Sequence, residues 1–260
     1  MTTSFHPPAL ANPNQLDATL LALGYAVLSP DIFAQLAGVD LAQLNEFKPQ
    51  WNSLPPDTYL KDGGRYRRRR HSCFVVDGEH VTQVAHRAHW QPVEYNALHG
   101  GMQRWFEPML PGMVDQDAWR QLLVWLGRVA SQHSPAQPAS YQLTSAQPWF
   151  VEAHQFRIDT TDGIGRPTPE GAHRDGVDLV AVFMVDRAGI KGGETRVFDA
   201  AGPNGQRFTL TQSWSLLLLD DARVIHESTP IQPTGTAGEA GHRDTLVVTL
   251  RGGGFQGDAV

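Results

Sequence analysis

Cysteine is almost absent from this sequence. Cys73 is the only cysteine among 260 residues, so an internal disulfide is excluded and a reducing compartment is favoured. The first residues contain neither a basic start nor an apolar segment, so they give no indication of a signal peptide. We therefore expect a cytoplasmic protein.

Excess positive charge and long apolar runs are also lacking. Lys and Arg number 21 against 27 Asp and Glu, which gives a net charge of −6, so we expect no general attraction to nucleic acid or to an anionic membrane surface. The longest apolar run, Leu179 to Val185, is far too short to cross a bilayer. Nucleic acids and membranes are therefore not expected as partners.

The composition that is present is typical of a globular protein. Hydrophobic residues make up 41% of the chain and charged residues 18%. A chain of this length can bury a substantial core, and closed β architectures of this size commonly form one domain. We expect a single domain over residues 1–260, with a helical and mixed part at about 1–148 and a β core at about 149–251.

Local signals predict helices mainly in the first half of the chain. Asn14 is expected to cap a first helix, and residues 24–28 to form a strand. Ser29, followed by proline, suits a helix start, and Gly38 is expected to divide the next segment into two short helices. Asp115 is expected to cap a longer helix that carries an apolar stripe at helical spacing. The stripe comprises Trp119, Leu122, Leu123, Leu126, Val129 and Ala130.

From residue 149 onward the pattern changes to short β-like runs bounded by Gly, Pro, Asn or Asp. The turn at Asn204 and Gly205 is typical of a hairpin, which favours antiparallel pairing. Helices first and strands afterwards predict an α+β fold in which the helices buttress one sheet of a jelly roll. The runs are 149–158, 177–185, 194–198, 207–210, 214–219, 223–227 and 243–251.

The segment Gly171–Gly176 is the strongest candidate for a metal site. In an extended segment, residues two apart point to the same side, so His173 and Asp175 can converge on one point. His226, in a separate strand-like run, can supply a third ligand if a sheet brings it back. Two imidazoles and one carboxylate leave open positions on an octahedral iron(II) ion. A His-x-Asp pair also occurs by chance, and it is the Gly-rich turn, the following buried strand and the downstream histidine that favour the metal interpretation.

One dense basic cluster lies at residues 65–71. If it forms a strand, Arg67 and Arg69 share one face and the intervening arginines the other, so about half of them could serve one pocket. We expect structural pairing with acids, with one arginine reaching the active site; nucleic-acid binding is disfavoured in so acidic a chain. Residues 90–106 mix aromatic, amide and charged groups, and the sequence does not decide whether they line a pocket or cap the β core.

Other charged and imidazole side chains lie in the predicted strands. On the last strand, Arg243 and Arg251 share a face and are both candidates for an inward cationic site. His242 has the opposite parity and is expected to lie outside. His154 is more typical of a hydrogen-bonded core residue than of a metal ligand, and Glu227 is expected to point away from His226.

Together these motifs resemble the Fe(II)- and 2-oxoglutarate-dependent dioxygenases, and more narrowly the bacterial free-amino-acid hydroxylases of the isoleucine 4-hydroxylase type. The resemblance covers most of the chain, and the order of the motifs is as informative as their identity. The segments that carry it are 100–101 with 104–106, 154–157, 169–176, 192–195, 226–231 and 243–244.

The resemblance implies a double-stranded β-helix with iron ligands at His173, Asp175 and His226. It also implies that Arg243 binds the distal carboxylate of 2-oxoglutarate, because a planar guanidinium forms two parallel hydrogen bonds to a carboxylate; Arg251 is the fallback. The implied cofactors are Fe(II), 2-oxoglutarate as cosubstrate, and O2, and the implied reaction is hydroxylation of a free aliphatic L-amino acid with release of succinate and CO2.

Several alternatives stay open at this point. The substrate carboxylate needs a second cationic partner, for which Arg104, Arg157, Arg174 and one of Arg67 to Arg70 are candidates. A cupin-type metalloprotein without 2-oxoglutarate dependence, or a non-catalytic stress-response binding module, would share the fold. The identity of the amino acid, the position hydroxylated and the oligomeric state are not determined by the sequence.

Overall fold

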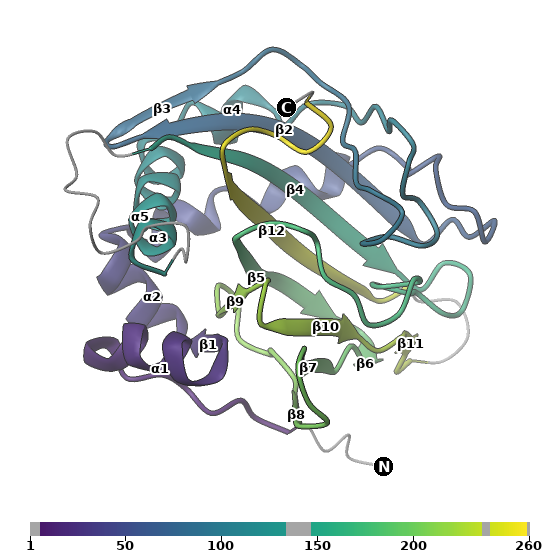
Figure 1. The fold of residues 1–260 in the computed structure, drawn as a ribbon. Helices are drawn as coiled ribbons and strands as arrows, with labels where there is room; N and C mark the ends of the chain where they lie inside the picture. Colours follow the sequence, from purple (N-terminus) through teal and green to yellow (C-terminus); the bar gives the residue numbers. More distant parts are fainter. Residues whose placement is uncertain (1–5, 134–146, 236–239, 259–260) are drawn as a thin grey trace.

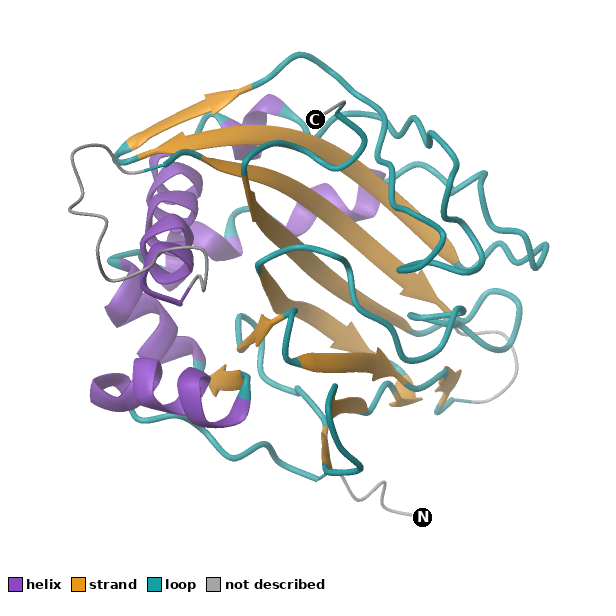
Figure 2. Ribbon diagram, in the orientation of Figure 1, coloured by secondary structure: helices purple, strands orange, loops and turns teal. Residues whose placement is uncertain are grey.

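The fold is antiparallel, rich in β-structure and of the α+β class, with one large sheet and two small ones (Figures 1 and 2). The computed structural model describes residues 6–133, 147–235 and 240–258. The large sheet has the strand order β1-β9-β5-β12-β4-β2-β3. Its strands are β1 (Tyr25–Leu28), β2 (Arg67–Asp77), β3 (His80–Gln83), β4 (Trp149–Asp159), β5 (Leu179–Ala188), β9 (Leu216–Asp220) and β12 (His242–Gly252).

The small sheets face the large one across the lower part of the molecule (Figure 1). One has the order β10-β7-β8 and the other pairs β11 with β6. The predicted hairpin forms between β7 and β8, but its connection is residues 200–204 and Gly205 already belongs to β8; Asp199 donates its backbone N–H to the carbonyl of Asn204 at 2.9 Å. The strands are β6 (Ile190–Gly192), β7 (Thr195–Asp199), β8 (Gly205–Phe208), β10 (Val224–Ser228) and β11 (Ile231–Pro233).

The helices lie to one side of the large sheet (Figure 2). The stripe predicted around Leu122 is buried along α5 and belongs to the same apolar core as the outer face of the large sheet. No helix in the described ranges is long and apolar enough to span a membrane. The helices are α1 (Leu16–Leu23), α2 (Pro30–Ala37), α3 (Leu41–Asn45), α4 (Pro111–Val114) and α5 (Asp117–His133), with 3₁₀ turns at Pro13–Gln15 and Lys48–Ser53.

The helix boundaries confirm two of the four predicted signals. The Ser29 side chain accepts a hydrogen bond from the backbone N–H of Ile32 at the start of α2, and Gly38 ends α2 in the left-handed conformation at φ 68°, which glycine adopts without a Cβ penalty. Asn14 is not a cap, because Asn12 accepts the N–H of Asn14 and a 3₁₀ turn precedes α1. Asp115 is also wrong as a cap: it ends the short helix α4, and α5 begins two residues later.

The strand runs were predicted in the right places with shifted ends, but two features were missed. The short strands β6 and β11 were not expected, because a strand of three residues is too short to show an alternation of apolar and polar residues. The basic run forms β2, which pairs with β4 and places a strand from the first half of the chain inside the large sheet. The boundary expected at about residue 148 therefore does not divide the sheet.

Side-chain alternation gives the large sheet two different faces. On β4, Val151 and Ala153 pack into the core below the helices, whereas Glu152, His154 and Phe156 line a cavity on the other face. The indole N–H of Trp51 donates to the carbonyls of Phe156 and Thr245, at 3.0 and 3.2 Å, and so ties the second 3₁₀ turn to β4 and β12.

The burial of α5 predicts a large stability difference between two leucines. Leu122 is fully buried, whereas Leu21 on α1 is 65% exposed. We expect Leu122→Ala to lower the free energy of unfolding by about 2–5 kcal/mol, because it removes packed methyl groups and leaves a cavity. Leu21→Ala should change it by less than about 0.5 kcal/mol. Urea unfolding followed by circular dichroism measures both; equal effects would contradict the packing described.

Candidate active site

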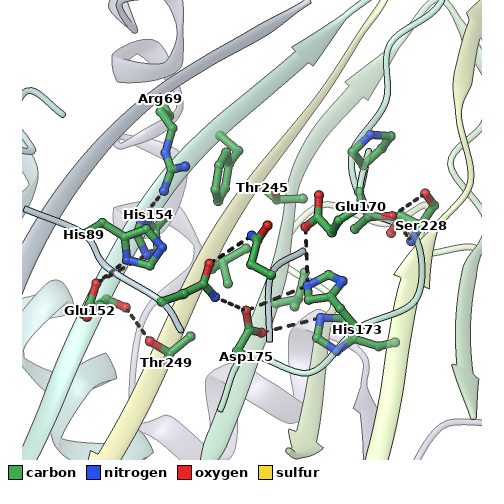
Figure 3. A pocket seen from close by; sticks show the side chains of 18 of the residues that line it. Arg69, His89, Glu152, His154, Glu170, His173, Asp175, Ser228, Thr245 and Thr249 are labelled. Carbon is green, nitrogen blue, oxygen red and sulfur yellow. Dashed lines mark hydrogen bonds and ion pairs between the residues drawn. The ribbon is translucent and has the colours of Figure 1, made fainter. Parts of the chain in front are cut away.

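A cavity lies between the large sheet and the segments that face it (Figure 3). Its floor is the inward face of β2, β4 and β12, where side chains two apart enter the same space. Its opposite wall is formed by residues of the 167–177 loop and by β10, through His226 and Ser228. The floor residues are Arg67 and Arg69 from β2, Glu152, His154, Phe156 and Ile158 from β4, and Arg243, Thr245, Val247 and Thr249 from β12.

The structure brings His173, Asp175 and His226 together at this wall. Nε2 of His173 lies 3.8 Å from Oδ1 of Asp175, and Nε2 of His226 lies 3.7 Å from Oδ2 of the same carboxylate. These distances exceed hydrogen-bond length, so the three groups face one another without being bonded to one another. All three offer ligand atoms within 4.8 Å of each other. Two imidazoles and one carboxylate with this spacing suit a ferrous ion.

Backbone contacts hold the three groups in place, although residues 173–175 do not form a regular strand. His173 and His226 form an isolated antiparallel bridge, with N–H to carbonyl distances of 3.0 and 2.9 Å. The Nδ1–H of His173 donates to the carbonyl of Gly171 at 2.9 Å, which leaves Nε2 as the ligating nitrogen. The expectation of an extended strand here is thus wrong in detail; one bridge suffices to set the convergence.

Asp221 was missed by sequence reasoning, yet it anchors this loop. Its carboxylate accepts the backbone N–H groups of Asp175, Gly176 and Val177 at 3.0, 2.7 and 3.1 Å. No local pattern could reveal this role, because Asp221 directly follows β9, far along the chain from the loop it holds. In the sequence, Asp221 was marked only by its position in a short polar turn after an apolar run.

Burial and charge shift the ionisation of the three groups. Burial, followed by the charge of His173, lowers the pKa of His226 to about 3. Burial raises the pKa of Asp175. Burial lowers the pKa of His173, but the carboxylates of Asp175 and Glu170 outweigh it, and the net shift is upward. A neutral, lone-pair-bearing His226 is the form that a metal requires.

Arg243 is a buried cation that forms no ion pair with an acid in the described part of the chain. It lies on β12, lines the cavity and is 4% exposed, and burial followed by the neighbouring Arg187 lowers its pKa to about 10. Its Nε is buried without a hydrogen-bond partner among the described residues. Gly193, at φ 68°, lies against it: a Cβ there would lie 3.5 Å from Cδ of Arg243. An anionic ligand in the cavity would satisfy this guanidinium.

The structure places only one of the two candidate arginines of the last strand in the cavity. Arg251 donates to the carbonyls of Gly254 and Phe255, at 2.7 and 3.4 Å, and does not line the cavity. Strand parity alone could not separate it from Arg243, because β12 extends beyond Thr249, its last residue in the cavity. His242 lies on the other face, as expected, with Nε2 3.2 Å from Asp186.

The candidate arginines for a substrate carboxylate divide in the same way. Arg67, Arg69 and Arg104 line the cavity. Arg157 is excluded because it lies on the opposite face of β4, where its Nε and Nη2 donate to the carboxylate of Asp244 at 2.8 and 2.7 Å. Arg174 lies outside the cavity, with its guanidinium 5.9 Å from the ring centroid of Tyr95.

The alternation predicted for the basic run is confirmed. Arg67 and Arg69 face the cavity, and Asp57 lies 2.7 Å from Nε of Arg67 and 3.8 Å from Nη1 of Arg69. Arg68 and Arg70 face away and pair with other acids, at 3.6 and 2.8 Å. One buried carboxylate thus serves two cavity cations, so the end of the cavity near β2 keeps surplus positive charge.

A second group of histidines lies beside Arg69 and was not predicted from the sequence (Figure 3). Glu152 accepts from Nε2 of His71 at 2.8 Å and from Nδ1 of His89 at 2.6 Å. Nη2 of Arg69 donates to Nδ1 of His154 at 2.8 Å, so Nε2 of His154 carries the proton in its neutral form. These nitrogen and oxygen atoms are joined by hydrogen bonds, whereas the ligands of a metal site would direct free lone pairs at a common point. This group is therefore a buried polar network. It confirms that His154 is a hydrogen-bonded residue.

Asp57 predicts a pH-dependent stability term. Burial raises its pKa, but the guanidinium groups of Arg67 and Arg69 outweigh it and hold the pKa below its ordinary value. A carboxylate with a depressed folded-state pKa stabilises the fold above the unfolded pKa of about 3.9 and loses that contribution as the pH falls. We expect Asp57→Asn to lower the free energy of unfolding by about 3–5 kcal/mol at pH 7, because it leaves buried guanidinium groups unpaired.

The difference between Asp57→Asn and the wild type should shrink as the pH falls from about 5 to 3. Asp162→Asn is the matched control, because Asp162 pairs with Arg65, whose side chain is 79% exposed, and surface pairs contribute little. Urea unfolding at several pH values measures the effect. A pH-independent difference for Asp57→Asn would show that its charge is not the stabilising element.

The comparisons with known proteins agree with this geometry. The sequence model of the 2OG-Fe dioxygenase family matches residues 48–249, a span that contains the cavity residues described above. The chain belongs to this family and is a 2-oxoglutarate-dependent oxygenase, an oxidoreductase that uses Fe(II), 2-oxoglutarate and O2. A search of curated proteins found no match.

Among solved structures, a bsmA homolog from Methylobium petroleophilum PM1 is 50% identical in sequence, with a TM-score of 0.87, over 99% of this chain and 100% of that one. Two more distant structures share the fold. The Fe(II)/α-ketoglutarate-dependent dioxygenase TqaL has 20% identity and a TM-score of 0.70, over 95% and 90% of the two chains. IDO from Bacillus thuringiensis has 17% identity and a TM-score of 0.68, over 93% and 99%.

Proposed function

We propose that this protein hydroxylates a free aliphatic L-amino acid, with conversion of 2-oxoglutarate to succinate and CO2. One observation supports this most directly: a two-histidine, one-carboxylate group lines the same cavity as Arg243, a buried arginine whose Nε has no hydrogen-bond partner among the described residues. Binding of 2-oxoglutarate would use both groups, because this molecule has a metal-chelating end and a distal carboxylate.

In this proposal His173, Asp175 and His226 hold the ferrous ion. When bound, Fe(II) and 2-oxoglutarate supply the oxidising chemistry that places one atom of O2 on a substrate carbon. The residues themselves contribute position and exclusion of water. The bridge between His173 and His226 fixes the two imidazoles, and Asp221 fixes the backbone of Asp175.

Arg243 is proposed to bind the distal carboxylate of 2-oxoglutarate. A guanidinium presents donors in a planar fork that matches a carboxylate, and this one is buried, where charge-assisted hydrogen bonds are strongest. Arg187, which lies opposite it in the β5–β12 register, adds positive charge. The buried charge of Arg243 favours a carboxylate at this end of the cavity.

The other end of the cavity is proposed to receive the amino acid. Arg104 and Arg67 each have a buried guanidinium nitrogen, Nε and Nη2 respectively, without a partner among the described residues. Glu170 has a carboxylate oxygen in the same condition, and its other oxygen lies 3.7 Å from Nε2 of His173. Unsatisfied cations and an unsatisfied anion in one cavity suit a ligand that carries both charges, as a free amino acid does.

Apolar floor residues support the aliphatic part of the assignment. Phe156 and Ile158 line the cavity from β4, which lies between β2 and β12, and Val247 lines it from β12. Contact between these residues and an aliphatic side chain would be favourable, because it removes apolar surface from water.

The architecture and the setting are proposed from the same observations. The large sheet and the facing β10-β7-β8 and β11-β6 sheets are arranged as the two halves of a double-stranded β-helix would be (Figure 1). We propose that residues 1–260 act as one domain, that the protein works in the cytoplasm on a small molecule, and that nucleic acids and membranes are not its partners.

Removal of a metal ligand should abolish turnover. We expect His173→Ala, Asp175→Ala and His226→Ala each to reduce succinate release from 2-oxoglutarate to background in the presence of Fe(II) and a panel of L-amino acids, because two ligands do not retain the ion. His242→Ala is the matched control, since His242 faces the other side of β12, and it should retain turnover. Mass spectrometry of the amino acids should show a gain of one oxygen. Wild-type activity in any of the three ligand variants would contradict the assignment.

The two arginines of β12 should differ in their effect on 2-oxoglutarate. We expect Arg243→Met to raise the KM for 2-oxoglutarate about 10- to 100-fold, which corresponds to the loss of a charge-assisted hydrogen bond of about 1.5–3 kcal/mol. Arg251→Met, which removes the same charge from the same strand outside the cavity, should leave the KM within about twofold. Steady-state succinate assays measure both; an unchanged KM in Arg243→Met would refute its role.

A further inference from the structure

Gln91 connects a cavity cation to a proposed metal ligand. Its Nε2 donates to Oδ1 of Asp175 at 3.1 Å, and its Oε1 accepts from Nη2 of Arg104 at 3.0 Å and from Nδ2 of Asn96 at 3.1 Å. Gln91 is buried and lines the cavity. Among the described residues, Gln91 is the side chain that donates a hydrogen bond to the carboxylate of Asp175. The two histidines that face this carboxylate lie beyond hydrogen-bond distance.

The orientation of this amide follows from its neighbours. The backbone N–H of His99 donates to Oδ1 of Asn96 at 2.8 Å, so the amide nitrogen of Asn96 must face Gln91. Arg104 has no acceptor atoms, so it too must meet the oxygen of Gln91. Two donors therefore hold Oε1, and the N–H₂ group of Gln91 has to point at the carboxylate.

Arg104 is also free to bind an anion. Its Nη2 is held by Gln91, while its Nε is buried without a partner in the described part of the chain. Burial, followed by the charge of Arg67, lowers its pKa to about 10. A ligand carboxylate on Nε would weaken the field that Arg104 exerts on the Gln91 amide.

We propose that Gln91 is a positioning residue that holds Asp175 in its ligating orientation and couples it to the state of Arg104. The inference rests on the proposed function, because it requires Asp175 to be a metal ligand. Groups that donate hydrogen bonds to ligating carboxylates tune metal affinity without touching the metal. Through this amide, an anion bound to Arg104 would change the hydrogen bond that Asp175 accepts, and with it the affinity of the site for the metal.

The first test compares two replacements of Gln91. Gln91→Glu keeps an oxygen for Arg104 and Asn96 but turns a second oxygen toward Asp175, and Gln91→Met removes both contacts at similar volume. We expect Gln91→Met to weaken Co(II) binding to the metal-free protein about 10- to 100-fold and to change the visible absorption of the Co(II) complex. Gln91→Glu should change the same absorption, while its added negative charge opposes the loss of affinity. Gln83→Glu, which places the same charge on the exposed strand β3, is the control and should bind like the wild type.

The second test addresses the coupling to Arg104. Arg104→Met and Arg69→Met each remove one cation from the cavity, but only Arg104 contacts Gln91. Loss of positive charge by itself would strengthen Co(II) binding in both variants. The proposal predicts that Arg104→Met weakens binding several-fold and alters the Co(II) absorption, whereas Arg69→Met does neither. Circular dichroism and thermal unfolding confirm that the variants are folded.

The outcomes separate this inference from the proposed function. If the wild type binds no Co(II) and releases no succinate, both fall together. If the wild type binds Co(II) and both Gln91 variants bind it equally well, with unchanged absorption, Gln91 has no positioning role although the enzyme assignment stands. If Gln91→Met weakens binding but Arg104→Met and Arg69→Met behave alike, the coupling to Arg104 is refuted.

Discussion

The antiparallel pairing of β12 with both β4 and β5 is the constraint on which the rest of the structure depends. Because alternate residues of a strand face opposite sides of a sheet, this register decides at once which residues enter the apolar core and which enter the cavity. Leu246, Val248 and Leu250 pack below the helices, while Arg243 and Thr245 face the cavity. A shift of one residue would bury the charges in the core and expose the apolar side chains to the cavity.

The cavity is lined by several charged groups, and the fold compensates them unevenly. Asp57 serves both Arg67 and Arg69, and Glu152 binds both His71 and His89, so each acid on this side of the floor is shared between two partners. Arg67, Arg104, Arg243 and Glu170 retain buried atoms without partners among the described residues. Unsatisfied polar groups are costly in a closed interior, and here they coincide with the places where ligand charges are expected.

The facing wall is held mainly by backbone hydrogen bonds. One bridge joins the 173 segment to β10, and the Asp221 carboxylate gathers three successive N–H groups of the 175–177 backbone. The loop lacks the two-residue alternation of a strand, so its geometry is fixed by its contacts with the strands on both sides. This explains why the ligand residues converge although only one of them lies in a regular strand.

Much of this protein could be predicted from the sequence because the signals were local. The amphipathic stripe of α5, the Ser29 cap, the Gly38 helix end and most of the β runs follow from periodicity and from backbone preferences, which act between residues close in sequence. The alternation of Arg67 and Arg69 with their neighbours required only the two-residue period of a strand. The grouping of His173, Asp175 and His226 was predicted from their residue types and spacing, and the structure brings them together.

Only the tertiary structure decided the contacts between distant segments. It placed β2 beside β4, directed Arg243 into the cavity and Arg251 out of it, and removed Arg157 and Arg174 from the candidates. It also revealed Asp221, Gln91 and the histidines around Glu152, which no local pattern indicates. The reason is physical: a side chain's partner across a cavity is set by the packing of whole sheets, and that packing depends on contacts between residues far apart in the chain.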